Sequence, residues 1–171
     1  MLRLGAGGLA MAAAGPALAA TAAGLVRRLA FHHLHTGEIV RATYWADGAW
    51  QPEGLRAIDR VLRDFRTDEV AGMDIRLLEL LHGLAARVES DRPFEVISGY
   101  RSPKTNAKLA SRSKGVARRS LHMRGMAIDI RLPQTSLASL KRAAIALRAG
   151  GVGYYPRSGF IHVDTGRIRY W

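Results

Sequence analysis

Two short segments alternate strictly between apolar and polar side chains, and this alternation constrains the fold most. In MAIDIRL (126–132), the methionine and the two isoleucines take one face of an extended chain, and Asp129 takes the other. In FIHVD (160–164), the isoleucine and valine take one face, and His162 and Asp164 take the other. The pattern predicts two strands, each with an apolar face toward the core and a polar face that carries chemistry.

His122 and Asp129 lie seven positions apart in SLHMRGMAIDI (120–130). In one helix the two side chains would be about 10 Å apart along the axis, and in one strand they would project from opposite faces. Neither arrangement lets both reach one ion at about 2 Å. We therefore predict a bend at Arg124-Gly125, which brings His122 and Asp129 together.

If the two predicted strands are neighbours in one sheet, His122, Asp129, His162 and Asp164 converge. Two imidazoles and one carboxylate suit zinc, with a fourth position open for water. Two alternatives stay open from the residues alone. A histidine on a strand is often a hydrogen-bonded structural residue, and Asp129 could pair with one of the many arginines.

The rest of the chain predicts amphipathic helices and short strands in one domain, without repeats or an interdomain linker. We expect a hairpin at 31–50, helices at 53–66, 73–89, 103–110 and 136–149, strands at 94–98 and 151–155, and a flexible basic loop at 111–120.

The chain carries 26 basic and 14 acidic residues, a net charge of +12. Eight basic residues and no acidic one lie between Glu95 and Asp129. Such a charge favours an anionic partner, whether nucleic acid, a membrane surface or the bacterial cell wall, although the excess arginine could simply cover solvated faces. The absence of cysteine excludes disulfides, thiolate metal sites and a cysteine nucleophile.

The N-terminus carries no charged residue from Leu4 to Val26. The small-x-small triplet at 17–19 is typical of a signal-peptidase site, so we predict a signal peptide at 1–20, cleaved near Ala19 or Ala20. The alternatives are an uncleaved membrane anchor and a buried alanine-rich helix. We expect an exported protein of the periplasm or cell envelope.

Three segments carry a resemblance to a known family: SGYRSPKTN, SLHMRGMAIDI and GGVGYYPRSGFIHVDTGRIRYW. They resemble the zinc D-Ala-D-Ala metallopeptidase superfamily, in the branch of murein endopeptidase K, and the resemblance runs from about His35 to Trp171. It implies a metallopeptidase domain at 31–171 with an α+β fold of the Hedgehog/DD-peptidase type. This is a small antiparallel sheet flanked by helices, with Zn²⁺ on the sheet.

The resemblance also implies roles for individual residues. The H-x6-D motif of the superfamily falls on His122 and Asp129, and its late histidine ligand falls on His162. The arginine of its GYRS element falls on Arg101, which would stabilise the oxyanion.

One departure affects the general base. Many relatives carry a catalytic glutamate three residues before the last histidine, where this chain has Gly159. Our candidate is Asp164, which shares a strand face with His162. The alternative is that Asp164 orients a ligand imidazole.

The implied function is zinc-dependent hydrolysis of peptide cross-links in peptidoglycan, with stem peptides as the substrate. Two alternatives keep the fold: a D,D-carboxypeptidase, and a wall-binding module without catalysis. A nucleic-acid-binding protein or metal nuclease would suit the charge, but the export segment argues against it, and no nucleic acid partner is expected. The sequence leaves open which bond is cut, whether the N-terminal segment is a membrane anchor, and the oligomeric state.

Overall fold

The computed structural model describes residues 26–113 and 115–171, so the predicted signal peptide lies outside the described residues. Eight strands form one sheet in the order β3-β2-β1-β4-β5-β7-β6-β8. The strands are β1 (Arg27–His33), β2 (Ile39–Ala46), β3 (Ala49–Trp50), β4 (Phe94–Ser98), β5 (Ala127–Arg131), β6 (Gly151–Tyr155), β7 (Phe160–Asp164) and β8 (Arg169–Tyr170). The helices are α1 (Pro52–Val61), α2 (Ile75–Arg87), α3 (Pro103–Arg112), the short 3-10 helix η1 (Leu121–Arg124) and α4 (Leu137–Leu147).

The α+β class expected from the resemblance is confirmed, but the expectation of a small antiparallel sheet is wrong. The sheet is mixed, because β1 pairs with β4 in parallel and β6 pairs with β8 in parallel. The parallel pairing of β1 with β4 places Phe31 beside Phe94, with ring centroids 6.3 Å apart. This apolar contact joins the N-terminal hairpin to the central strands, which enlarges the sheet to eight strands.

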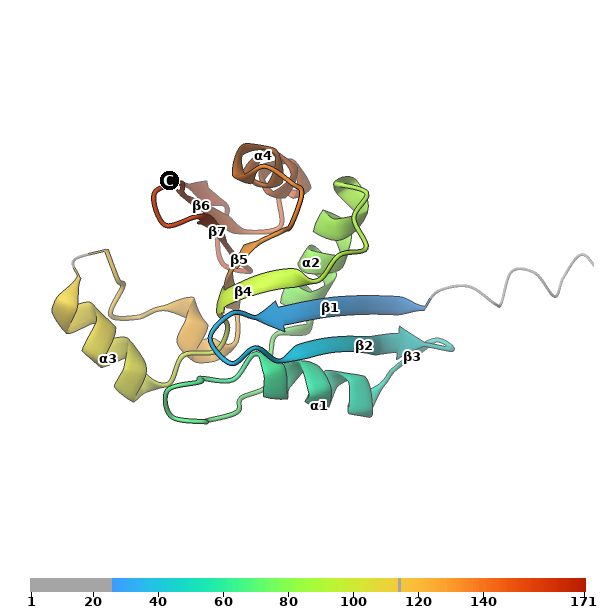
Figure 1. Ribbon diagram of the computed structural model, residues 1–171, viewed down its shortest axis with the longest axis horizontal. Coiled ribbons are helices and arrows are strands. Elements are labelled where there is room, and N and C mark those ends of the chain that lie inside the picture. Colours follow the sequence, from blue (N-terminus) through green and yellow to red (C-terminus); the bar gives the residue numbers. More distant parts are fainter. Residues whose placement is uncertain (1–25, 114) are drawn as a thin grey trace, which may run out of the picture.

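Helices α2 and α4 pack against each other and cover one face of the sheet (Figure 1). The face of α2 toward the core consists of leucines whose side chains are completely buried: Leu77, Leu78, Leu81 and Leu84. Ile128 and Ile130 of β5 and Ile161 and Val163 of β7 are buried in the same core. The apolar faces predicted for these two strands therefore point into the core, and their polar residues lie on the opposite face of the sheet.

The strand β3 pairs with only the last two residues of β2. Helix α1 packs along the rest of that edge of β2. A side chain at Gly54 would collide with the backbone carbonyl of Thr43, so only glycine permits this approach. The backbone N–H of Gln51 donates to the carbonyl of Tyr44 at 2.9 Å. Helix and strand edge are thus in direct backbone contact.

Helix α3 projects from the body of the molecule and is followed by the segment that leads into η1 (Figure 1). The Ser102 side chain caps the start of α3 by accepting from the backbone N–H of Thr105 at 3.2 Å. None of the described helices is long and apolar enough to cross a membrane.

Candidate metal centre

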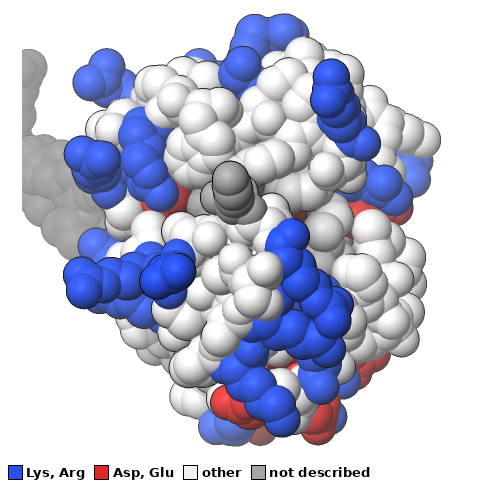
Figure 2. Space-filling view, turned by 90° about the vertical axis from the view of Figure 1, so that its left-hand side faces the viewer, with Lys and Arg blue, Asp and Glu red and all other residues white. Residues whose placement is uncertain are grey.

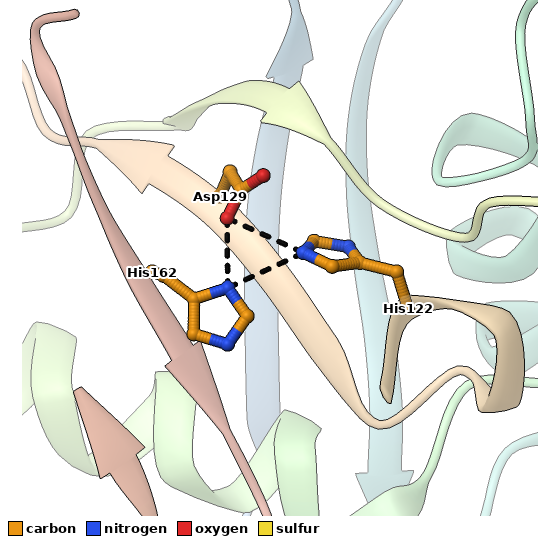
Figure 3. Close-up of side chains that lie close together, drawn as sticks. All are labelled: His122, Asp129 and His162. Carbon is orange, nitrogen blue, oxygen red and sulfur yellow. Dashed lines mark hydrogen bonds and ion pairs between the residues drawn. The ribbon is translucent and has the colours of Figure 1, made fainter. Parts of the chain in front are cut away.

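Three side chains from separate elements point toward one another on the polar face of the sheet (Figure 3). His122 comes from η1, Asp129 from β5 and His162 from β7, and all three are buried. Each offers one nitrogen or oxygen atom, and these atoms lie within 4.8 Å of one another. The geometry therefore allows all three residues to bind a single ion.

Strand register brings two of these residues together. In the antiparallel pair of β5 and β7, Asp129 stands directly opposite His162. Directly opposite residues share a face of the sheet, and Asp129 Oδ1 lies 2.9 Å from His162 Nδ1. The prediction that these two strands, β5 and β7, are neighbours in one sheet is confirmed.

The bend predicted at Arg124-Gly125 brings His122 to the other two. The Ser120 side chain caps η1, and Gly125 ends it with a left-handed backbone (φ 64°), a conformation that favours glycine. A side chain at Gly125 would collide with the backbone of Gly72. With this bend, His122 Nε2 lies 3.3 Å from Asp129 Oδ1 and 3.3 Å from His162 Nδ1.

Hydrogen bonds on the far side of each ring fix which nitrogen carries the proton. His122 Nδ1 lies 2.7 Å from the carbonyl oxygen of Gly99, which only accepts, so a neutral ring is protonated at Nδ1. His162 Nε2 lies 2.9 Å from Asp164 Oδ2, so this ring is protonated at Nε2. When both rings are neutral, both lone pairs face the Asp129 carboxylate. Three acceptors in mutual contact repel one another unless a cation lies between them, so the residues fit a zinc ion.

The electrostatics of the cluster agree with this fit. Burial raises the pKa of Asp129, but His122 and His162 outweigh burial and hold it well below its ordinary value. Burial lowers the pKa of His162, yet Asp129 and Asp164 outweigh burial and raise it above its ordinary value. The cluster therefore keeps a carboxylate ionised and favours positive charge among its three members.

Asp164 is fully buried, and other groups already occupy both of its oxygens. Oδ2 lies 2.9 Å from His162 Nε2 and accepts from Arg169 Nη2 at 2.7 Å. Oδ1 accepts from the backbone N–H groups of Gly166 (2.8 Å) and Gly151 (3.2 Å) and from Arg169. This arrangement favours the orienting role for Asp164 over the role of general base, because a base needs an oxygen that water can reach.

Arg101 is buried beside the cluster. Its Nη2 donates to Asp129 Oδ2 at 3.3 Å and to Ser98 Oγ at 3.2 Å. Its Nε has no partner among the described residues. Burial lowers the pKa of Arg101, and Asp129 opposes this effect. Arg101 therefore holds the outer oxygen of Asp129 from a buried position.

A cavity of about 400 Å³ adjoins the three converging side chains. Its other walls include Ser113, residues 115–117 and 119–121, and the aromatic residues Tyr155, Phe160 and Trp171. Among the described residues that line it, Asp129 is the only carboxylate. Gly159, the position of the expected glutamate in the resemblance described above, occupies the turn between β6 and β7 with a left-handed backbone (φ 74°).

Sequence reasoning did not identify three contributors to the site: the Gly99 carbonyl, Arg169 and Trp171. A backbone carbonyl has no sequence signal. Arg169 and Trp171 belong to the C-terminal segment GRIRYW, which has no alternation that predicts a partner. Only the parallel pairing of β8 with β6 brings these two residues to the site.

The α3 side of the cavity is basic (Figure 2). The exposed cations of α3 and the following loop form no ion pair among the described residues: Lys104, Lys108, Arg112, Arg118 and Arg119. Figure 2 views this end of the molecule, where groups of Lys and Arg side chains show with only small acidic areas between them. Anionic ligands are therefore attracted toward this end.

Comparison with known proteins places the chain among bacterial enzymes. Residues 21–171 match the family described as peptidoglycan L,D-endopeptidase MepK. The protein of that name from Escherichia coli (strain K12) is 39% identical over 168 residues, which cover 96% of this chain and 92% of the relative. The probable peptidoglycan L,D-endopeptidase MepK of Haemophilus influenzae is 41% identical over 146 residues, which cover 85% of this chain and 78% of the relative. The resemblance noted from the sequence is confirmed, and the chain belongs to the MepK family of peptidoglycan L,D-endopeptidases.

Proposed function

We propose that this chain is a zinc-dependent peptidoglycan endopeptidase that hydrolyses L,D peptide cross-links of the bacterial cell wall. The observation that carries the proposal is the convergence of three acceptor atoms, from His122, Asp129 and His162, on one point beside a cavity. The names of the relatives supply the substrate and the L,D bond class.

The residues divide the work as follows. His122, Asp129 and His162 would hold zinc through the atoms that face one another. When bound, the ion supplies a Lewis acid that polarises the scissile carbonyl and makes water nucleophilic near neutral pH. The Gly99 carbonyl and the Asp164 carboxylate fix the rings of His122 and His162 with their lone pairs inward.

Arg101 has two tasks in this proposal. Its Nη2 holds Asp129 Oδ2, which keeps Oδ1 directed at the two imidazoles. Its positive charge lies at the cavity wall, where it stabilises negative charge that develops on the oxygen of the cleaved amide.

We also propose an exported location, in the periplasm or cell envelope, because the substrate of the relatives is the cell wall. The signal peptide predicted at 1–20 supports this proposal, and the first described strand begins at Arg27. The metallopeptidase domain would therefore be intact after cleavage near Ala19 or Ala20.

The test is digestion of cross-linked muropeptides of defined linkage by the purified protein with zinc, with the fragments identified by mass. We expect cleavage of L,D cross-links, loss of cleavage with a chelator, and recovery when zinc is restored. The variant His162→Ala should lose both zinc and activity, whereas His32→Ala, on strand β1 and outside the three converging residues, should keep both.

Three results would contradict the proposal. Full activity of the demetallated protein would exclude the zinc mechanism. Release of a terminal D-amino acid alone would favour the carboxypeptidase. Binding of muropeptides by the zinc-loaded protein without any cleavage would favour the wall-binding module.

A further inference from the structure

Trp171 packs directly beside His162. In the antiparallel pair of β6 and β7, Gly153 stands opposite His162 on the cavity face of the sheet. Because Gly153 has no side chain, the indole of Trp171 fills this place, and a Cβ at 153 would lie 2.7–2.8 Å from indole atoms. The ring centroid of Trp171 lies 5.4 Å from that of His162. The absence of a side chain at Gly153 thus determines where the indole lies.

The indole holds the hydroxyl of Tyr155. Trp171 Nε1 donates to Tyr155 Oη at 2.7 Å. An indole N–H only donates, so Oη is the acceptor, and the proton of the tyrosine is free to be donated elsewhere. No other described residue forms a hydrogen bond with Oη. The Tyr155 ring is stacked on Phe160, with centroids 4.7 Å apart, so Phe160 holds the ring and Trp171 holds the hydroxyl.

Tyr155 and Trp171, which share this hydrogen bond, both line the cavity that adjoins the three converging side chains. Tyr155 is two residues from Gly153 on β6 and therefore shares its face of the sheet. A hydroxyl that already accepts a strong hydrogen bond is polarised and becomes a better donor. The cavity thus contains a fixed donor that the mechanism above does not use.

We propose that the Tyr155 hydroxyl donates a hydrogen bond to a peptide oxygen of the substrate bound in this cavity, and that Trp171 is the positioning residue that holds it there. The proposal rests on the proposed function, since the substrate is a cell-wall stem peptide. The atom that receives the hydrogen bond is a carbonyl or carboxylate oxygen of that peptide.

The first test is Tyr155→Phe, which keeps the stacked ring and removes only the hydroxyl. We expect kcat/KM on a cross-linked muropeptide to fall about 100-fold, with zinc content and melting temperature unchanged. A loss in kcat assigns the scissile carbonyl as the acceptor, and a loss in KM assigns another oxygen of the peptide.

The matched control is Tyr154→Phe. Tyr154 is the neighbouring residue on β6, and its ring lies on the opposite face of the sheet beneath Lys141 Nζ, 4.7 Å from the ring centroid. This variant should keep the wild-type kcat/KM. If Tyr155→Phe also stays within twofold of wild type, the proposal is wrong.

The positioning role of Trp171 has a separate test. Trp171→Phe removes the indole donor but keeps an aromatic ring, and we expect kcat/KM to fall about 10-fold. Because Trp171 acts through the hydroxyl, the double variant with Tyr155→Phe should be no worse than Tyr155→Phe alone. Independent losses that multiply in the double variant would exclude the positioning role.

Binding separates this proposal from the proposed function. Calorimetry of the zinc-loaded protein with a stem tetrapeptide should show about 10-fold weaker binding for Tyr155→Phe than for wild type. If wild type binds the tetrapeptide but never cleaves a cross-linked muropeptide, the proposed function fails, and the binding comparison still decides the role of Tyr155. A wild-type chain that neither binds nor cleaves would overturn both proposals.

Discussion

At the scale of single residues, the site depends on which hydrogen bonds are already occupied. Asp164 illustrates this, because its oxygens accept from His162, from Arg169 and from two backbone N–H groups. A carboxylate in this position strengthens a histidine as a metal ligand. Because its oxygens are occupied, Asp164 is suited to orienting the His162 ring rather than to accepting a proton from water.

The variant Asp164→Asn tests this role. We expect zinc affinity to fall about 10- to 100-fold, measured by competition with a chelator, because the negative charge behind His162 is lost. Asp47→Asn, in the exposed turn between β2 and β3, is the matched control and should leave zinc affinity unchanged. Unchanged affinity in Asp164→Asn, with loss of the acidic limb of the pH–rate profile, would instead identify Asp164 as the general base.

His33 makes the stability of the protein depend on pH. Its ring is buried, Nδ1 accepts from the backbone N–H of His35 at 3.3 Å, and Nε2 has no partner among the described residues. Burial, reinforced by the neighbouring His35, lowers the pKa of His33 to about 4. The folded protein therefore keeps this ring neutral at pH values where the unfolded chain, with a pKa of about 6.5, already binds a proton.

We therefore predict that the contribution of His33 is complete above about pH 6.5 and is lost as the pH falls toward 4. The loss amounts to about 2–3 kcal/mol of the free energy of unfolding. Urea denaturation of wild type and His33→Leu across this range measures it, and the difference between the two curves removes the contribution of other histidines. If the two free energies fall in parallel, His33 does not carry this pH dependence.

The position of the three converging residues could be predicted from the sequence, whereas their partners could not. Alternation within β5 and β7 places Asp129 and His162 on the polar faces of their strands. His122 and Asp129 could not meet if they belonged to one helix or one strand, so the chain must bend between them. The role of the three as zinc ligands stays a prediction. The contacts of Asp164 with Arg169 and of Trp171 with His162 depend on β8, which joins the sheet only through tertiary pairing.

At the scale of elements, the turn from η1 to β5 matters most for the site, because it places His122 close to Asp129 and His162. Gly125→Ala would place a side chain in a left-handed backbone and against the carbonyl of Gly72. We expect a loss of about 1–3 kcal/mol in the free energy of unfolding and weaker zinc binding, measured by thermal denaturation and chelator competition.

The control for this variant is Gly83→Ala in α2. Its added Cβ would make an ordinary 3.6 Å contact with Leu147, and alanine favours helix over glycine. This variant should be as stable as wild type or more so, with unchanged zinc affinity. If both variants keep wild-type stability and zinc affinity, the left-handed turn at Gly125 is not required for the site.

Element boundaries show where local patterns lose their predictive value. The helix predicted at 53–66 ends at Val61, although Leu62 and Phe65 continue the apolar spacing. The loop beyond it is held by the buried Asp64 carboxylate, which accepts from the backbone N–H of Ser102 at 2.9 Å. A partner far along the chain outweighs helical periodicity here, whereas strands β4, β6 and β7 keep their predicted bounds.

At the scale of the whole molecule, the uneven distribution of charge affects how the protein meets a polymer. The exposed cations of α3 and its following loop lie at one end of the molecule, beside the cavity (Figure 2). Peptidoglycan repeats free carboxylates along its strands, so many of them can interact with this end at once. A soluble fragment offers only a few.

We predict that Lys104→Gln/Lys108→Gln lowers the rate on intact sacculi several-fold at low salt while leaving the rate on a soluble muropeptide nearly unchanged. Raising the ionic strength should remove the difference from wild type, because exposed charges are screened. The matched control is Arg56→Gln/Arg87→Gln, which removes two exposed cations from α1 and α2. If the control pair slows digestion of sacculi equally, net charge alone is responsible.

The α+β class of the fold could be predicted, but the number of strands in the sheet and their mixed pairing could not. The α+β class followed from the resemblance, and the C-terminal strands followed from alternation. The parallel contact of β1 with β4 joins segments about sixty residues apart, and no local pattern specifies such a pairing. This contact makes the sheet mixed and enlarges it to eight strands.

The close approach of α1 to β2 also limits self-association. A sheet edge with free N–H and C=O groups is a template on which another molecule can add a strand. Here the Gly54 contact keeps a helix over one border of the sheet, and the short β8 occupies the other. A methyl group at position 54 would collide with the Thr43 carbonyl, so the absence of a side chain at this one residue is what permits the helix to cover the edge of β2.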